Sequence, residues 1–386
     1  MGIEERAGAW RLLGKELDNG WKIIEPIGWD PRTGDKTDHY NGTGGNFSVP
    51  YLVEKDGKRA FLKAIDLTNA MNSVDVMIEL QNISAAHNFE MNLLNICKGA
   101  SMNRVVVALE IGQLNVGPNI QDTAPYLIFE LANGDVRKRV QKKSGSVRLA
   151  WWLRSLHHAA IGLSQLHTEK ITHQDLKPSN LLSFGPENGF KLSDLGRSTC
   201  ENAPGPHDAL HFSGDRGYAP PEILYGQISP EAFERRKSCD LYMLGSMIFF
   251  FASGFGCTPL LFNKLPLEQR PAPFGGWLGN YLTILPIIQH LFTNLLYEMS
   301  TDLPNGKIGD GLIKAASELC NPDPVVRGHP LEKGAGSNHL SLARYVSLFD
   351  YLAKLADIEA RKSCSWSGYL RLMFVWNKSG FGSSVC

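Results

Sequence analysis

The sequence predicts an α+β protein with two lobes, on three observations. Strand-like runs cluster before Gly134, and helical periodicity dominates after Arg148. The chain has 386 residues, and single hydrophobic cores rarely grow past about 250–300 residues. We therefore expect a small lobe of antiparallel strands with one main helix, then a larger, mostly helical lobe. The expected divisions are a leader of helical appearance (1–20), the small lobe with a hinge (21–134), the large lobe (135–329) and an extension (330–386).

Charge and cysteine content narrow the class of protein. Lysine plus arginine equals aspartate plus glutamate, at 39 each, so no overall field attracts nucleic acid or an anionic membrane. The seven cysteines include no C-x-x-C pair, which argues against a zinc ribbon and a secreted disulfide framework. The first residues include two acids where a signal peptide would be basic. We expect a cytoplasmic protein without a nucleic-acid partner.

One segment, 241–262, is apolar enough to raise the question of a membrane span. Gly245, Gly254 and Gly256 interrupt it, and Pro259 breaks it. No basic cluster follows immediately. We expect a buried core helix here and no membrane span.

The residues around Asp175 have the composition of a catalytic site. Asp175 and Asp194 each follow a short apolar run, and Lys177 and Asn180 lie between them. Such a set can position a hydroxyl group against a metal-bound phosphate. With Gly196, these residues resemble the catalytic and metal-binding loops of eukaryotic-type (Hanks-type) Ser/Thr protein kinases, H-R-D-L-K-x-x-N and D-F-G. The match is specific because all five occur in order and at the family's spacing.

The resemblance implies a two-lobed protein-kinase-like fold and a role for each residue. Asp175 would accept the proton of the substrate hydroxyl, and Lys177, as a second catalytic residue, would contact the γ-phosphate. Asn180 and Asp194 would bind Mg²⁺, and Leu182 would lie under the adenine ring. Lys177, two residues after the aspartate, is typical of the Ser/Thr-specific form of the loop. The implied cofactors are ATP and Mg²⁺, and the implied partner is a protein substrate.

Two residues of the motif differ from the family pattern. Gln174 replaces the usual arginine, and Leu195 replaces the usual phenylalanine. In family members with the arginine, a phosphate on the activation loop neutralises that cation. Because glutamine carries no charge, we expect activity without phosphorylation of the loop hydroxyls, Ser198, Thr199 and Ser213.

The small lobe contains a candidate lysine for the nucleotide phosphates. Lys63 lies in a β-patterned run and resembles the V-A-I-K lysine of the family, a catalytic residue that holds the phosphates and pairs with a helix glutamate. We favour Glu90 as that partner because Leu93 and Leu94 follow it at the spacing of a core-facing stripe. Glu79 is the alternative.

A glycine-containing loop precedes this lysine. Gly44 and Gly45 would let backbone N–H groups approach the phosphates closely. The rest of the family pattern is weaker, because Ser48 stands where the last glycine is expected. Pro50 replaces the following valine, and a proline that cannot donate to a β-ladder suits only an edge strand.

A strand and turn at 126–135 resemble the family's hinge, although a plain strand followed by an Asn-Gly turn explains the same residues. Glu130 and Ala132 would meet the adenine edge through their backbone, Phe129 would form the back wall, and Asp135 could reach the ribose. Phe61 falls on the same strand face as Lys63, where the family usually has alanine, so the adenine pocket would be narrower.

The large lobe is predicted to begin with an amphipathic helix over 148–167. Its histidines, His157, His158 and His167, are more plausible as satisfied helix side chains than as metal ligands, since no acid or cysteine is spaced to join them.

Three more residues resemble structural positions of the kinase large lobe. Asp240 would hold the backbone of the catalytic loop, and Arg327 would pair with Glu222 at the end of the activation segment. Asp215 stands where Ser/Thr kinases usually have a threonine that braces the catalytic loop. Beyond the resemblance lie a long stretch at 255–310, a helical period at 340–360 and an aromatic-rich run at 366–376.

The resulting hypothesis is a protein kinase that transfers the γ-phosphoryl group of Mg-ATP to Ser or Thr. A pseudokinase-type scaffold that only binds nucleotide is one alternative, and its supporting features are the replacements Ser48, Pro50, Phe61 and Asp215. A small-molecule phosphotransferase is the other. Relatives of that kind usually lack both the full catalytic-loop pattern and the expected Glu222–Arg327 pair.

Overall fold

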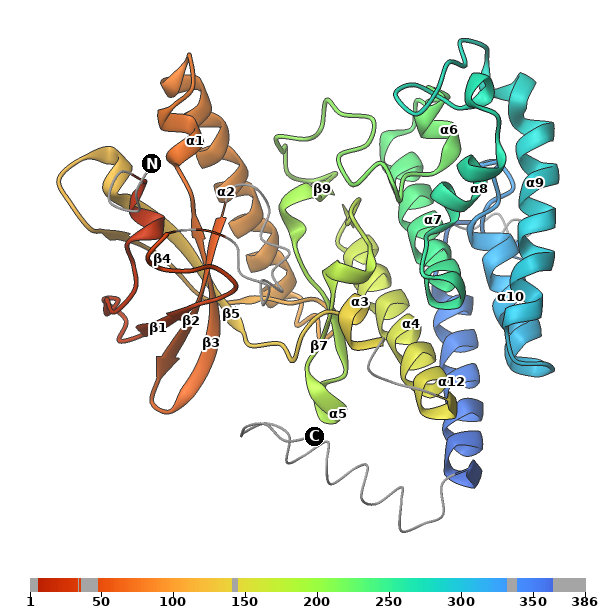
Figure 1. Ribbon diagram of the computed structural model, residues 1–386, viewed down its shortest axis with the longest axis horizontal. Helices are drawn as coiled ribbons and strands as arrows, with labels where there is room; N and C mark the ends of the chain where they lie inside the picture. Colours follow the sequence, from red (N-terminus) through yellow and green to blue (C-terminus); the bar gives the residue numbers. More distant parts are fainter. Residues whose placement is uncertain (1–5, 34, 36–47, 141–144, 332–338, 364–386) are drawn as a thin grey trace. The chain divides into compact units, whose positions relative to one another are not determined.

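A computed structural model describes residues 6–33, 35, 48–140, 145–331 and 339–363. The chain divides into two compact units, one ending at Gly134 and one beginning at Asp135. Strands dominate the first unit and helices the second (Figure 1). The structure therefore has the α+β class that the sequence predicts.

The first unit contains one antiparallel sheet with the strand order β1-β2-β3-β5-β4. Buried side chains of β2 and β3, together with those of β5, form the core on one face. The strands are β1 (Lys22–Pro26), β2 (Ser48–Lys55), β3 (Lys58–Ile65), β4 (Ala108–Asn115) and β5 (Thr123–Glu130).

The edge-strand assignment of Pro50 is wrong. Pro50 lies in β2, between β1 and β3, opposite Lys63. The proline is tolerated because the β1 ladder ends at the pair Pro26–Tyr51. On that side the Pro50 carbonyl accepts hydrogen bonds from the Ile27 amide at 3.1 Å and from the Trp29 indole at 3.1 Å. An N–H group at Pro50 would point toward β1 just beyond the end of its pairing with β2. No backbone hydrogen bond of the sheet is therefore lost by having proline there.

The main helix of the first unit is α2 (Val76–Gly99), preceded by the single turn α1 (Thr68–Met71). The Asp75 carboxylate caps α2 by accepting a hydrogen bond from the Ile78 amide at 3.1 Å. The buried stripe of α2 lies in its second half and includes Glu90, Leu93 and Leu94. The helix therefore directs this half toward the protein interior.

The described part of the leader, from residue 6, does not form the expected helix and instead packs into the first unit. Within residues 6–20 the helical part is the 3-10 turn Gly8–Trp10. Leu12 and Leu17 are buried in the sheet core. The Trp10 indole donates a hydrogen bond to Asp66 Oδ2 at 2.8 Å, and the Tyr51 hydroxyl donates one to the Ala9 carbonyl at 2.8 Å. Of the hydrophobic residues that suggested a helix, Leu12 and Leu17 lie in the core and Trp10 packs against it, whereas Leu13 is exposed.

The second unit is mostly helical. The predicted helix over 148–167 is confirmed as part of α4. The principal helices are α4 (Gly145–Thr168), α7 (Ala232–Ser253), α8 (Cys257–Lys264), α9 (Tyr281–Asp302), α10 (Lys307–Leu319) and α12 (Ala343–Ser363). Short turns are α3 (Val136–Arg139), α5 (Gly185–Asn188) and α6 (Pro221–Leu224), and short strands are β6 (Ile171–Thr172), β7 (Leu181–Ser183), β8 (Phe190–Leu192) and β9 (Thr199–Cys200).

The helical period at 340–360 is confirmed by α12, which packs along α4. Arg154 of α4 pairs with Asp350 at 3.1 Å and with Asp357 at 2.9 Å. Apolar α12 side chains such as Phe349 and Leu352 are fully buried. This part of the extension is therefore integral to the second unit, whereas the aromatic-rich run at 366–376 lies outside the described residues.

The apolar segment after residue 240 forms a core helix, as expected. In α7, the side chains from Arg236 to Phe251 are buried. In the described part of the chain, the membrane-span criteria of length and apolar composition are met by no single helix. They are met by α7 and α8 taken together, which bend by 72° at their break.

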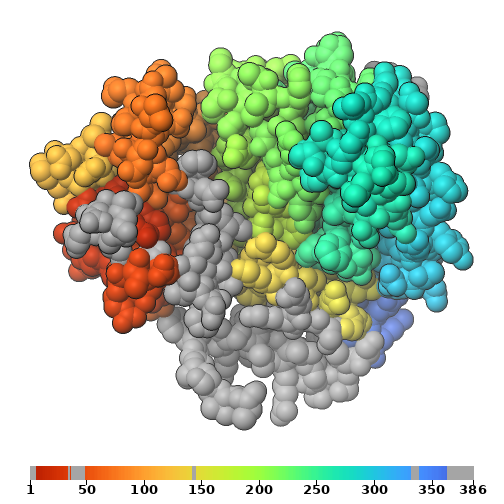
Figure 2. Space-filling model, turned by 45° about the horizontal axis from the view of Figure 1, so that its top comes forward, coloured from red at the N-terminus to blue at the C-terminus, as the bar shows by residue number. Residues whose placement is uncertain are grey.

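Helix α9 contributes to the surface of the second unit, in the cyan region of Figure 2. Its buried positions recur every three or four residues, from Tyr281 through Ile288 to Met299. The opposite face is exposed and includes Leu282 and Tyr297.

Candidate active site

The first unit brings Lys63 and Glu90 together. Lys63 Nζ lies 3.0 Å from Glu90 Oε1 and 3.1 Å from Oε2. The Lys63 side chain is 21% exposed and that of Glu90 is 7% exposed. Glu79, the alternative partner, is exposed in the first turn of α2. The pairing predicted for Glu90 is therefore formed.

Phe61 lies on the strand face that also carries Lys63, as the alternation predicts. Ala60, Leu62 and Ala64 point into the sheet core, whereas Phe61 and Lys63 are half-buried on the other face. Sequence reasoning missed His87, which lies on α2 about one turn before Glu90 and therefore on the same side of the helix. Burial, with the Lys63 charge, lowers the pKa of His87, so its imidazole is neutral beside the lysine.

The predicted hinge residues divide between the two units. Phe129 and Glu130 end β5 and are half-buried, with Phe129 opposite Phe61 in the sheet. Ala132 follows in the same unit and is also half-buried. Asp135 belongs to the second unit, where its carboxylate caps α3 by accepting a hydrogen bond from the Lys138 amide at 3.0 Å. Gly44 and Gly45 lie outside the described residues.

Asp175 is held by several donors in the second unit. Its Oδ1 accepts from the Asp215 amide at 2.8 Å and from Lys177 at 3.2 Å. Its Oδ2 accepts from Asn180 Nδ2 at 2.9 Å and lies 3.0 Å from Lys177 Nζ. With a side chain only 7% exposed, the carboxylate has a fixed orientation. A base held in this way can accept a proton from a hydroxyl without first reorganising.

The catalytic loop is anchored by Asp240, as expected. Asp240 Oδ2 accepts from the His173 amide at 2.9 Å and Oδ1 from the Gln174 amide at 2.8 Å. His167 adds a contact of 2.8 Å to Oδ2, a partner that sequence reasoning missed. Gly214 permits close approach to this loop, since a Cβ there would lie 1.9 Å from the Gln174 carbonyl oxygen.

The histidines of α4 have protein partners. His158 Nδ1 accepts a hydrogen bond from the Phe190 amide at 3.0 Å, and His167 contacts Asp240. Across the described residues, no three His, Cys, Asp or Glu side chains gather as a metal-binding group.

Asn180 and Asp194 have the chemistry that Mg²⁺ requires. The amide nitrogen of Asn180 donates to the Asp175 carbonyl at 2.8 Å and to its carboxylate at 2.9 Å, so the amide oxygen is directed elsewhere. Asp194 is half-buried and adopts φ 64 and ψ 72, a left-handed conformation that is uncommon outside glycine. Mg²⁺ bound with nucleotide needs only one or two protein oxygens besides phosphates and water. The two residues fit such an ion.

Hydroxyls of the activation segment are buried and hydrogen-bonded. Ser198 donates to the His173 carbonyl at 3.3 Å, Thr199 bonds the Thr172 hydroxyl at 2.8 Å, and Ser213 donates to the Arg197 carbonyl at 2.5 Å. All three side chains belong to buried residues. In this conformation they are protected from modification.

Gln174 makes bonds that need no phosphate. Its side-chain nitrogen donates to the Arg236 carbonyl at 2.9 Å. The Arg236 guanidinium in turn donates to the Asp208 carbonyl of the activation segment at 2.8 Å. The Gln174 amide and the Arg236 guanidinium therefore both have backbone carbonyls as hydrogen-bond acceptors. The expectation of activity without loop phosphorylation stays a prediction, and these bonds are consistent with it.

Glu222 and Arg327 form the pair that the sequence predicts across 105 residues. The guanidinium binds both carboxylate oxygens, at 2.6 and 2.8 Å. The Arg327 side chain has no exposed area and that of Glu222 is 4% exposed. This bidentate pair fixes the end of the activation segment to the linker that follows α10.

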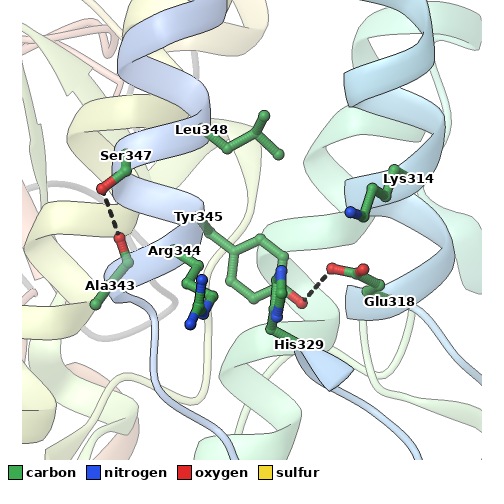
Figure 3. Close-up of a pocket in the computed structure, with 8 residues that line it drawn as sticks. All are labelled: Lys314, Glu318, His329, Ala343, Arg344, Tyr345, Ser347 and Leu348. Carbon is green, nitrogen blue, oxygen red and sulfur yellow. Dashed lines mark hydrogen bonds between the residues drawn. The ribbon is translucent and has the colours of Figure 1, made fainter. Parts of the chain in front are cut away.

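A pocket of about 460 Å³ lies between α10 and α12 (Figure 3). At its wall the Tyr345 hydroxyl donates a hydrogen bond to Glu318 at 3.0 Å. Burial, with the Glu318 charge, raises the pKa of Tyr345. None of the predicted site residues lines this pocket.

Comparison with known proteins decides the family. A family model described as the protein kinase domain matches residues 42–262, which is more than half of the chain. The chain belongs to the protein kinase domain family. The matched range includes Lys63, Glu90 and the catalytic loop, and Arg327 lies beyond it.

Several curated kinases are similar to the chain over part of its length. Cell division control protein 2 homolog 3 of Trypanosoma brucei brucei is 33% identical over 173 residues, 43% of the chain and 53% of the relative. An Aurora kinase of Debaryomyces hansenii is 30% identical over 147 residues, 37% of the chain and 31% of the relative. CBL-interacting protein kinase 26 of Oryza sativa subsp. japonica is 24% identical over 215 residues, 55% and 38% respectively. The chain thus spans about half or less of these relatives.

Proposed function

We propose that this protein is an ATP-dependent serine/threonine kinase that phosphorylates protein substrates, itself included. The observation that carries the proposal is the orientation of the Asp175 carboxylate by Lys177, Asn180 and the Asp215 amide. The related proteins support it, since their names are those of protein kinases. Lys177, two residues after the aspartate, favours Ser and Thr as acceptors.

Each group has a separate task in the proposed reaction. Asp175 accepts a hydrogen bond from the acceptor hydroxyl and takes its proton as the oxygen attacks the γ-phosphorus. A new O–P bond forms, the bond between the γ-phosphorus and the bridging oxygen breaks, and ADP leaves with that oxygen. Lys177 places a positive charge beside Asp175 where the transferred group must pass.

The remaining residues bind the nucleotide. Lys63 supplies a cation for the phosphates, and Glu90 orients its ammonium group. Asn180 and Asp194 would hold Mg²⁺, which neutralises phosphate charge when it is bound. Phe61, Phe129, Glu130, Ala132 and Leu182 are proposed to contact the adenine, with Asp135 near the ribose.

We also propose a cytoplasmic location. The described cysteines, Cys97, Cys200, Cys239, Cys257 and Cys320, are buried and form no disulfide with one another. Five buried thiols without a disulfide among them are typical of a reducing compartment.

The test is transfer of labelled phosphate from ATP to the protein itself and to a generic protein acceptor. We expect transfer by the wild-type protein and none by Asp175→Asn, with mass spectrometry locating phosphate on Ser or Thr. Nucleotide binding without any transfer would favour the scaffold alternative. Transfer only to small molecules, with no phosphorylated residue, would favour the small-molecule phosphotransferase.

A further inference from the structure

The ammonium group of Lys177 faces two carboxylates. Lys177 Nζ lies 3.0 Å from Asp175 Oδ2 and 3.6 Å from Asp215 Oδ2. The Lys177 side chain is 24% exposed and that of Asp215 is 45% exposed. A cation beside the predicted base is therefore shared with a second, more exposed anion.

Asp215 acts on the catalytic loop in two separable ways. Its backbone amide donates to Asp175 Oδ1 at 2.8 Å, a contact that any residue except proline can make. Its side chain accepts from the Gly217 amide through Oδ1 at 2.9 Å and presents Oδ2 to Lys177. The neutral threonine usual at this position brings no charge, so the carboxylate is the feature particular to this chain.

The Asp215 charge also acts on a neighbouring group. Tyr218 lies three residues further along the same segment, and its amide donates to the Asp215 carbonyl at 2.9 Å. Burial raises the pKa of Tyr218 to about 12, and the Asp215 carboxylate adds to that rise. A negative charge at Asp215 is thus felt within this segment.

We propose that Asp215 is a positioning residue that restrains Lys177 and weakens its hold on the terminal phosphate of bound ATP. The inference rests on the proposed function. A phosphoryl group that moves to a hydroxyl at Asp175 has to come within reach of an ammonium 3.0 Å from the same carboxylate. Asp215 and the terminal phosphate therefore compete for one cation. ADP lacks that phosphate, so Asp215 affects its binding little.

The variant Asp215→Asn separates charge from geometry. Asparagine keeps the side-chain oxygen for the Gly217 amide and the backbone amide for Asp175, and removes only the negative charge. We expect a non-hydrolysable ATP analogue with Mg²⁺ to bind Asp215→Asn about two- to fivefold more tightly than wild type, the range of a partly exposed ion pair. The affinity for ADP should stay unchanged. Asp215→Thr should shift binding in the same direction.

Two controls locate the effect. Asp208→Asn removes another half-exposed carboxylate from the same segment, 3.9 Å from Arg236 and not at Lys177. It should change neither affinity. In a Lys177→Ala background, Asp215→Asn should no longer improve binding of the ATP analogue, because the shared cation is gone.

The outcomes are distinguishable. An equal gain for ADP and the ATP analogue would show a general charge effect and overturn the inference. Unchanged or weaker binding of the analogue by Asp215→Asn would overturn it too. Nucleotide binding without phosphoryl transfer would refute the proposed function, and the comparison of ADP with the analogue would still decide the role of Asp215. A wild-type protein that binds no nucleotide would overturn both.

Discussion

The two units each contain a long-range ion pair, and the pairs differ in exposure. In the second unit, Arg327 and Glu222 are buried, with no exposed area on the arginine side chain. In the first unit, the Lys63 side chain that meets Glu90 is 21% exposed. Arg327 also donates to the Asn321 carbonyl at 2.9 Å and to the Ser238 hydroxyl at 3.0 Å. Its donors are committed to the protein interior.

The difference separates a structural pair from a pair suited to ligand binding. A buried guanidinium with several protein acceptors cannot leave without stranding a charge, and it has no surface for a ligand. A partly exposed lysine such as Lys63 keeps part of its ammonium hydration and can exchange it for phosphate oxygens. Exposure therefore predicts which variants unfold the protein and which only inactivate it.

The largest effect is expected at the buried pair. Arg327→Met strands Glu222 in the interior and should lower the free energy of unfolding by about 3–5 kcal/mol. The measurement is urea denaturation followed by circular dichroism. The double variant Arg327→Met with Glu222→Gln should recover part of the loss, because no buried charge is left unpaired. A loss below about 1 kcal/mol for Arg327→Met alone would contradict the structural role.

Lys63→Ala should affect phosphoryl transfer more than stability. Removing a preorganised cation from the phosphates should reduce phosphoryl transfer about 10²- to 10³-fold. The variant also leaves Glu90, whose side chain is only 7% exposed, without this partner, so the unfolding free energy should fall by about 1–3 kcal/mol, less than in Arg327→Met. Steady-state kinetics and urea denaturation of one preparation test both statements. A variant that unfolds as readily as Arg327→Met would remove the distinction between the two pairs.

Glu90→Gln sharpens the comparison within the first unit. The neutral amide holds Lys63 less firmly, and a charge-assisted hydrogen bond of about 1.5–3 kcal/mol is weakened. We expect kcat/KM for ATP to fall about tenfold, which corresponds to about 1.4 kcal/mol. Glu79→Gln is the matched control on the same helix and should have wild-type kinetics. Equal effects of the two variants on kcat/KM would mean that the Lys63–Glu90 pair does not contribute to the use of ATP.

Trp10→Phe tests a neutral donor to a carboxylate in the same unit. The change keeps an aromatic ring and removes the 2.8 Å hydrogen bond to Asp66. We expect a loss of about 1 kcal/mol in unfolding free energy. Trp21→Phe is the control, because the buried Trp21 Nε1 has no hydrogen-bond partner among the described residues. If Trp10→Phe were no more destabilising than Trp21→Phe, the hydrogen bond from Trp10 to Asp66 would not contribute to the stability of the first unit.

The smallest effect is expected at a surface pair of the second unit. The hydrogen bond from Lys354 and the nearby His157 and Arg154 hold the pKa of Asp350 below its usual value. The carboxylate thus stabilises the fold above the unfolded pKa near 3.8, and this contribution disappears as pH falls through the lower folded value.

The corresponding test uses pH. Asp350→Asn should lower the urea midpoint slightly at pH 7, and wild type and variant should converge toward pH 3. A difference that stays constant from pH 7 to pH 3 would show that the carboxylate charge is not the cause. A loss as large as that of Arg327→Met would show that exposure does not separate the pairs.

The sequence by itself determined the two-part α+β organisation and most pairings around the candidate site. Strand and helix periods differ enough to separate the units, because side chains repeat every two residues in strands and every 3.6 in helices. The Glu222–Arg327 pair was predictable because both residues match positions of the kinase pattern, and the structure shows why they must pair: both are buried, and buried charges need a partner. The choice of Glu90 over Glu79 followed from the apolar stripe beside it.

Only the tertiary structure decided how the leader, Pro50 and Asp215 are used. The leader packs on the first unit through single contacts, such as that of Trp10 with Asp66, which follow no local periodicity in the sequence. Pro50 lies in an inner strand because a neighbouring strand happens to end beside it. Asp215 braces Asp175 through its backbone amide. Every residue except proline has that group, so such a bond depends on where the chain is placed and leaves no mark in the sequence.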